Sequence, residues 1–122
     1  MAVSKVDQRW AFLTTEELYE KQFTLVALTT STTLIPAVSG STPAFILMDT
    51  PKENEYGTVC MDGVEKCKCG ETIKVGQFVA PSNTGLMQVA KTGQYIVGIA
   101  LEEGESGALI PILSHAGSGA KV

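Results

Sequence analysis

The segment "GTVCMDGVEKCKCG", residues 57–70, decides the fold that we predict from this sequence. Asp62 and Gly63 stand at its centre, and an Asp-Gly pair favours a two-residue hairpin turn because both residues can adopt positive φ angles. Side chains alternate between the two faces of a strand. The predicted hairpin therefore places Cys60, Cys67 and Cys69 on one face.

The sequence on both sides of this hairpin predicts more short strands. Apolar pieces alternate with turns that are rich in Ser, Thr, Gly and Pro, which is typical of chains made of many short strands. We therefore expect a mainly β protein, built as a small barrel or sandwich. The apolar pieces lie at 24–28, 33–38, 44–49, 73–80 and 86–90, and two further runs face each other across an acidic loop within 95–114.

The run 95–101 alternates between large and small side chains. Alternation assigns the larger residues to a face that fills the core, and the smaller ones to a face that another layer or subunit can approach closely. The larger set is Tyr95, Val97, Ile99 and Leu101, and the other set is Ile96, Gly98 and Ala100.

The N-terminal region predicts an arm followed by a short helix. Thr14 is suited to cap a helix, Glu17 completes a capping box, and Leu13 is placed to pack on Leu18. Arg and Trp dominate binding hot spots, so we predict that the segment before this helix contacts a partner. The alternative is that Trp10 and Phe12 fold onto the chain's own barrel. The predicted contact residues are Arg9, Trp10, Phe12 and Leu13.

These patterns divide the chain into three parts. We expect an N-terminal arm with the short helix over residues 1–22, a β-barrel body over residues 23–114, and a flexible tail over residues 115–122. The length of 122 residues fits one domain with a sizeable core.

Composition excludes several classes of function. The net charge is -4 and the nine basic residues are widely spread, so we expect no nucleic-acid binding. No stretch approaches the ~20 apolar residues of a membrane span, and the N-terminus lacks the apolar region of a secretory signal. We therefore expect a protein that is made in the cytoplasm.

No residue pattern points to catalysis. The odd number of cysteines favours reduced thiols packed in the core, although Cys60, Cys67 and Cys69 with His115 could supply four zinc ligands. No serine lies in a nucleophile elbow, and no glycine loop has the lysine of a phosphate-binding loop. The acidic cluster is typical of a solvated turn. This cluster comprises Glu102, Glu103 and Glu105. We therefore predict a protein that is not an enzyme and has no cofactor.

Residues 57–114 resemble a known family. The segments "GTVCMDGV", "GETIKVGQFVAPSNTGLMQVA" and "VGIALEEGESGALIPILS" are similar to the decoration, or cement, proteins of tailed-bacteriophage capsids. This resemblance implies a small β-barrel of the β-tulip type that sits on the outer surface of the mature head. It also implies that the protein binds the major capsid protein, cements neighbouring capsid subunits, and forms a homo-oligomer, most commonly a trimer.

Two other classes remain open. The segment "IKVGQFVAP" is similar to a strand of biotinyl and lipoyl carrier domains, but Lys91 lacks the neighbours of a modified lysine. A fiber-base or adhesin-like binding module is the other alternative, with Tyr56 and Tyr95 as the candidates for stacking on a sugar.

Overall fold

The computed structural model describes residues 8–41, 44–115 and 120–122, and these residues form nine strands and no helix. The prediction of a mainly β protein is confirmed. The strands are β1 (Gln8–Thr14), β2 (Leu25–Leu28), β3 (Thr33–Pro36), β4 (Ala44–Leu47), β5 (Tyr56–Lys68), β6 (Phe78–Pro81), β7 (Met87–Val89), β8 (Gly98–Ala100) and β9 (Leu109–His115).

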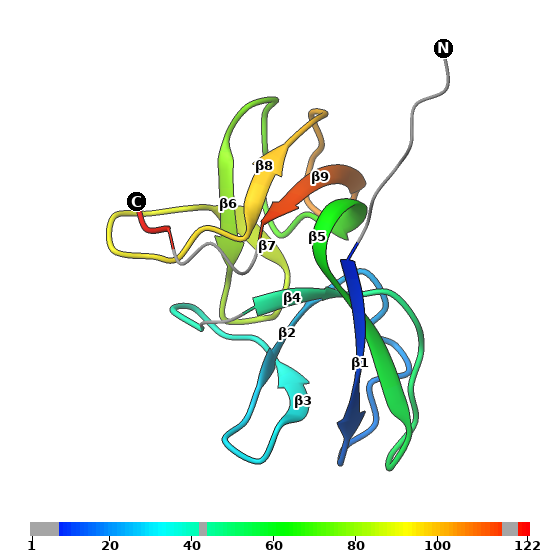
Figure 1. Cartoon of the computed structure of the whole chain (residues 1–122). Helices are drawn as coiled ribbons and strands as arrows, with labels where there is room; N and C mark the ends of the chain where they lie inside the picture. Colours follow the sequence, from blue (N-terminus) through cyan, green and yellow to red (C-terminus); the bar gives the residue numbers. More distant parts are fainter. Residues whose placement is uncertain (1–7, 42–43, 116–119) are drawn as a thin grey trace.

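The long strand β5 belongs to two parts of the molecule (Figure 1). The strands are ordered β1-β3-β2-β4-β5-β9-β8-β6-β7, and an additional pairing of β1 with β5 closes the first five into a barrel. The first half of β5 pairs with β1 and β4, whereas its second half pairs with β9. We call β1 to β5 the barrel, and we call β9, β8, β6 and β7, with the second half of β5, the second sheet.

The predicted turn at Asp62 and Gly63 is wrong, because β5 runs through both residues without reversing. Asp62 pairs with Gln8 of β1 and with His115 of β9, so the strand exchanges its neighbours at this point. β1 and β4 occupy the edges of the first half of β5 that a hairpin partner would need. Gly63 has a φ of 119°, which a glycine adopts without a steric penalty.

Two hydrophobic cores lie on opposite sides of the barrel wall. Alternation along β2 and β4 sends Val26 and Phe45 into the barrel and Leu25 and Ile46 toward the second sheet, so both strands are buried on both faces. All three cysteines belong to the core between the barrel and the second sheet. The buried residues of the barrel interior are Leu18, Val26, Leu34, Phe45, Leu47 and Val59, with Phe12, Leu28 and Met61 packed against them.

The predicted short helix after Thr14 does not form. The Thr14 hydroxyl donates to the carbonyl of Glu16 (2.6 Å) and accepts a hydrogen bond from its amide (3.3 Å), and residues 15–22 follow bends and turns. Leu18 is fully buried in the barrel, and its amide bonds to the carbonyl of Pro51. A helix this short is marginal on its own, so these tertiary contacts outweigh the capping signal.

Both ends of the described chain are tied to the body. Residues 9–13 lie within β1, so this part of the predicted arm is a strand of the barrel. Residues 1–7 of the predicted arm lie outside the described residues. In the predicted tail, His115 ends β9, and the Ala120 carbonyl accepts a hydrogen bond from the Ile96 amide. Val122 exchanges backbone hydrogen bonds with the segment at 93–94, and residues 116–119 are again outside the described part.

The prediction for residues 95–101 agrees with the structure at Val97, which is buried, but the two predicted faces are exchanged over residues 98–101. Gly98 and Ala100 are buried, Ile99 is half-buried, and Leu101 is exposed. A Cβ atom on Gly98 would lie 2.3 Å from the carbonyl oxygen of Leu113, so only glycine fits at this position. The smaller residues therefore face the crowded interior of the protein itself, and the larger ones face outward.

Candidate functional site

An apolar row crosses the outer face of the second sheet. Phe78 of β6 pairs with Ile99 of β8, Ile99 pairs with Leu113 of β9, and Leu113 pairs with Val64 of β5. Directly paired residues point to the same side of a sheet, so these four side chains lie next to one another. None of the four is buried, and Phe78 and Leu113 are exposed.

The row borders a groove of about 360 Å³. Alternation along β9 directs Ile112 and Ser114 inward and leaves Leu113 and His115 on the groove side. The described residues of the lining include no Lys, Arg, Asp or Glu, so the groove suits an apolar partner surface. The groove is lined by Phe78, Ile96, Gly98, Ile99, Leu113, His115 and Ala120. We call the groove and the row together the apolar face.

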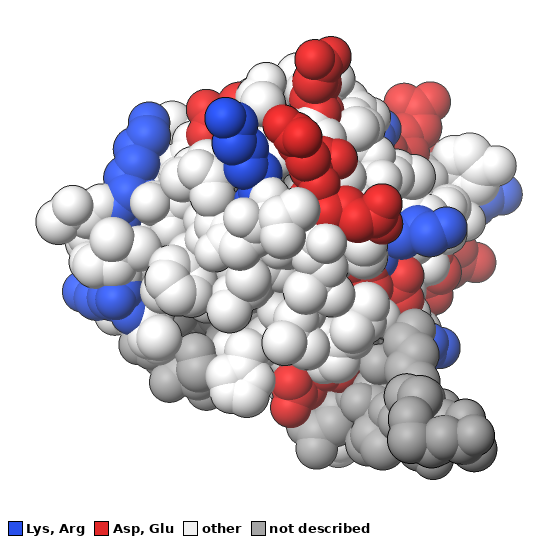
Figure 2. Space-filling view, turned by 90° about the horizontal axis from the view of Figure 1, so that it is seen from above, with Lys and Arg blue, Asp and Glu red and all other residues white. Residues whose placement is uncertain are grey.

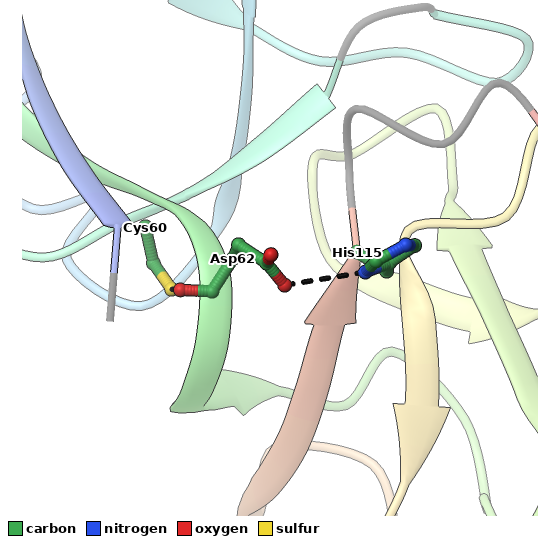
Figure 3. A network of polar contacts seen from close by, with 3 residues as sticks. All are labelled: Cys60, Asp62 and His115. Atoms are coloured by element: carbon green, nitrogen blue, oxygen red, sulfur yellow. Dashed lines mark hydrogen bonds and ion pairs between the residues drawn. The ribbon is translucent and has the colours of Figure 1, made fainter. Parts of the chain in front are cut away.

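A polar contact marks the end of the apolar face at the seam between the two halves (Figure 3). The Nδ1 atom of His115 lies 3.2 Å from Oδ1 of Asp62; the His115 side chain is 68% exposed and the Asp62 side chain is 46% exposed. The Cys60 thiol donates a hydrogen bond to the backbone carbonyl of Asp62 (3.7 Å) and does not contact the imidazole. Asp62 and His115 thus link β5 to β9, whereas the Cys60 hydrogen bond stays within β5, and the nucleophile-to-histidine contact of a catalytic triad is not formed.

The three thiols are buried and form no disulfide among the described residues, as core packing predicts. Burial raises the pKa of Cys67, and the neighbouring Cys69 raises it further; burial also raises the pKa of Cys69. A raised pKa keeps a thiol protonated, and a protonated thiol is a poor nucleophile and a poor metal ligand. Within the described residues, no group of three His, Cys, Asp or Glu side chains is placed to hold a metal ion.

The four contact residues predicted near the N-terminus do not form one surface. Phe12 stacks on Phe45 with ring centroids 6.2 Å apart, which is the predicted alternative of packing on the barrel. Leu13 is half-buried. Arg9 and Trp10 lie on the surface, and Trp10 is 63% exposed.

One face of the molecule has a broad area without charged side chains (Figure 2). The glutamates of the loop between β8 and β9 are exposed, as expected for a solvated turn. In Figure 2 this uncharged area lies at the centre of the view, and acidic and basic side chains lie around it, with most of the acidic ones toward the top and the right. In the described part of the chain, no helix has the length and apolar character to cross a membrane.

The two tyrosines named for sugar stacking differ in exposure. The Lys121 ammonium lies 4.7 Å from the ring centre of Tyr95, so one face of this ring is occupied. Tyr56 is exposed at the start of β5. The two rings therefore differ in how much of each is open for stacking on a sugar.

The fold is shared with a structural component of a phage head. No family model and no curated protein matches the sequence. Among solved structures, the chain is similar to the N base of head fiber gp8.5 in bacteriophage phi29, with a TM-score of 0.72 and 16% sequence identity. The alignment covers 96% of this chain and 98% of that chain, so the two share the whole fold and the small β-barrel class is confirmed.

Proposed function

We propose that this chain is a structural protein of a phage head, bound to the outer capsid surface, where it cements neighbouring copies of the major capsid protein. The observation that carries the proposal is the similarity in fold to a head fiber base over nearly the full length of both chains. The resemblance of residues 57–114 to capsid decoration proteins points to the same type of particle.

The construction of the protein suits an attachment role. A barrel closed by the pairing of β1 with β5 and a second core on its outer wall give a body with two hydrophobic cores. The apolar face supports a further part of the proposal, the formation of a homotrimer, since an exposed apolar row is stabilised when another subunit covers it. Three linked copies turn weak individual contacts with the capsid into one stable attachment through effective concentration.

Self-association is tested with Leu113→Asp, which places a charge in the middle of the apolar face. Light scattering coupled to size-exclusion chromatography should give three times the monomer mass for the wild type and the monomer mass for the variant. Val38→Asp, at another exposed apolar residue, is the matched control and should remain trimeric. A wild-type monomer at micromolar concentrations would contradict self-association.

Attachment and cementing are tested on heads purified from the encoding phage after deletion of this gene. Added protein should co-sediment with the heads at a saturating, fixed copy number. The decorated heads should then release DNA at a higher temperature than the bare heads, because a ligand that binds only the intact lattice stabilises it. Saturable binding without this increase would retain the attachment role and reject cementing.

A second candidate function is the base of a head fiber. It is favoured by the comparison itself, because the similar structure is the N base of a fiber. The two functions predict different density on the side of this protein that faces away from the capsid. A fiber base should carry further density that projects away from the head, whereas a cement protein should lie flat between capsid subunits.

A further inference from the structure

The strand β1 has one paired edge and one edge that is largely open. On one side, Gln8–Leu13 pair with β5. On the other side, β1 pairs with β3 only through Leu13 and Thr14. Along the remainder of this second edge, no described strand lies beside β1.

The hydrogen bonds of neighbouring residues fix the direction of the Ala11 peptide groups. The amide and the carbonyl of Thr58, the residue opposite Ala11, are directed to Asp49 and Met48 on the β4 side. The pair of Ala11 and Thr58 is therefore a non-hydrogen-bonded pair of the antiparallel ladder. Thr14 bonds to Glu55 and Asn54 on the β5 side, which gives the same alternation. The N–H and C=O of Ala11 thus point to the open edge.

The exposed indole of Trp10 lies next to these peptide groups. Trp10 is 63% exposed, although Phe12, on the same face of the strand, is packed against the barrel core. Tryptophan is enriched in binding hot spots because it buries a large apolar surface on contact. An open backbone edge and an exposed indole therefore occur together at one place.

The opposite end of the sheet is protected. The Met87 carbonyl of the last strand, β7, accepts a hydrogen bond from the Gly70 amide, and the Val89 amide donates to a carboxylate oxygen of Glu71. Native proteins commonly block exposed edges in this way, because an open edge pairs with other chains. The contrast makes β1 the edge at which a further strand can add.

We propose that the open edge of β1 accepts an extended segment of the major capsid protein as an added strand. The backbone of this segment pairs with Ala11, and one of its apolar side chains covers Trp10. Only an extended chain presents a donor and an acceptor at the spacing of a strand edge, which is why the occupant is a strand. The inference rests on the proposed function and names the surface through which it acts.

Two substitutions test this site, and neither removes a backbone hydrogen bond between β1 and β5. Ala11→Pro removes the outward N–H, and Trp10→Ala removes the indole. In titrations on heads that lack the protein, we expect about tenfold weaker binding for Ala11→Pro and about 30-fold weaker binding for Trp10→Ala. Tyr19→Ala removes another exposed aromatic residue and should bind like the wild type.

The outcomes separate the inference from the function on which it rests. Wild type that binds heads, with both variants binding equally well, overturns the strand-acceptor site and leaves the attachment role intact. Wild type that does not bind overturns both. Loss of self-association in the two variants, with unchanged binding to heads, assigns the edge to a second copy and also overturns the inference.

Hydrogen exchange keeps the test valid if Ala11→Pro does not fold. The amide of Ala11 in the wild-type protein should exchange at least about tenfold more slowly on heads than in solution, because a paired amide is protected. Exchange at the same rate in both states would contradict strand addition.

Discussion

The barrel and the second sheet use the same alternation of side chains for different purposes. In β4 of the barrel, Phe45 faces one core and Ile46 faces the other, so every position serves the fold. In β9 of the second sheet, Ile112 is buried, whereas Leu113 on the other face is exposed. An apolar residue that the fold does not bury is available to a partner. Both halves therefore contribute buried side chains to the stability of the protein, and the second sheet also leaves an apolar row exposed on its outer face.

The largest expected effect tests whether the two halves are one cooperative unit. Leu47→Ala in the barrel and Ile112→Ala in the second core should each lower the free energy of unfolding by about 3 kcal/mol, because each removes a fully buried side chain. Both variants should unfold in urea in a single transition, since β5 is shared by the two cores. Separate transitions in tryptophan fluorescence and far-ultraviolet circular dichroism would show that the halves are independent.

The close approach of β8 and β9 gives the second prediction. Gly98→Ala should cost about 2–3 kcal/mol, because the new Cβ would meet the backbone of Leu113 at 2.3 Å. Gly76→Ala is the control: its Cβ would meet no atom within 4 Å, and its positive φ should cost only about 1 kcal/mol. Equal losses in thermal melts would mean that the two strands adjust to the added methyl group.

Stability at alkaline pH reports on the core between the halves. Burial raises the pKa of Cys67 in the folded protein, so the native state keeps a proton that the unfolded chain loses above about pH 8.5. The contribution is complete below that pH, and stability falls as the pH rises, by about 1 kcal/mol between pH 8.5 and 9.5. Urea titrations should show a shallower pH dependence for Cys67→Ala. The same slope in both proteins would contradict a protonated buried thiol.

The smallest effect distinguishes two aromatic residues of β1. Phe12→Leu should destabilise the protein by about 1 kcal/mol, because Phe12 stacks on Phe45 in the barrel. Trp10→Ala should change stability by less than about 0.5 kcal/mol, since its side chain is largely exposed. A loss for Trp10→Ala as large as that for Phe12→Leu would assign the indole to the fold.

Local sequence patterns predicted where the strands lie better than they predicted which strands pair with one another. The apolar runs and turn residues predicted a mainly β chain, because alternation and turn chemistry depend on neighbours in sequence. The turn at Asp62 and Gly63 and the helix after Thr14 were predicted wrongly for the opposite reason. Pairing of β5 with β9 and burial of Leu18 depend on residues distant in the sequence, and these contacts outweigh the local signals.

The candidate surfaces show the same limit. Trp10 stood out because hot-spot residue types cluster at 9–13, but the sequence did not show that Phe12 turns into the barrel. The apolar face was missed, since Phe78 and Leu113 come together only through β8. The segment "LIPIL", residues 109–113, could have indicated this face, because apolar residues occupy both faces of the strand there.

The most direct test of the proposed role is a cryo-electron microscopy reconstruction of gene-deleted heads with and without the added wild-type protein. The attachment role predicts new density at symmetry-repeated positions on the outer capsid surface, with a shape that fits the barrel and the second sheet. Heads with identical surfaces in both reconstructions, across low and physiological salt, would contradict it.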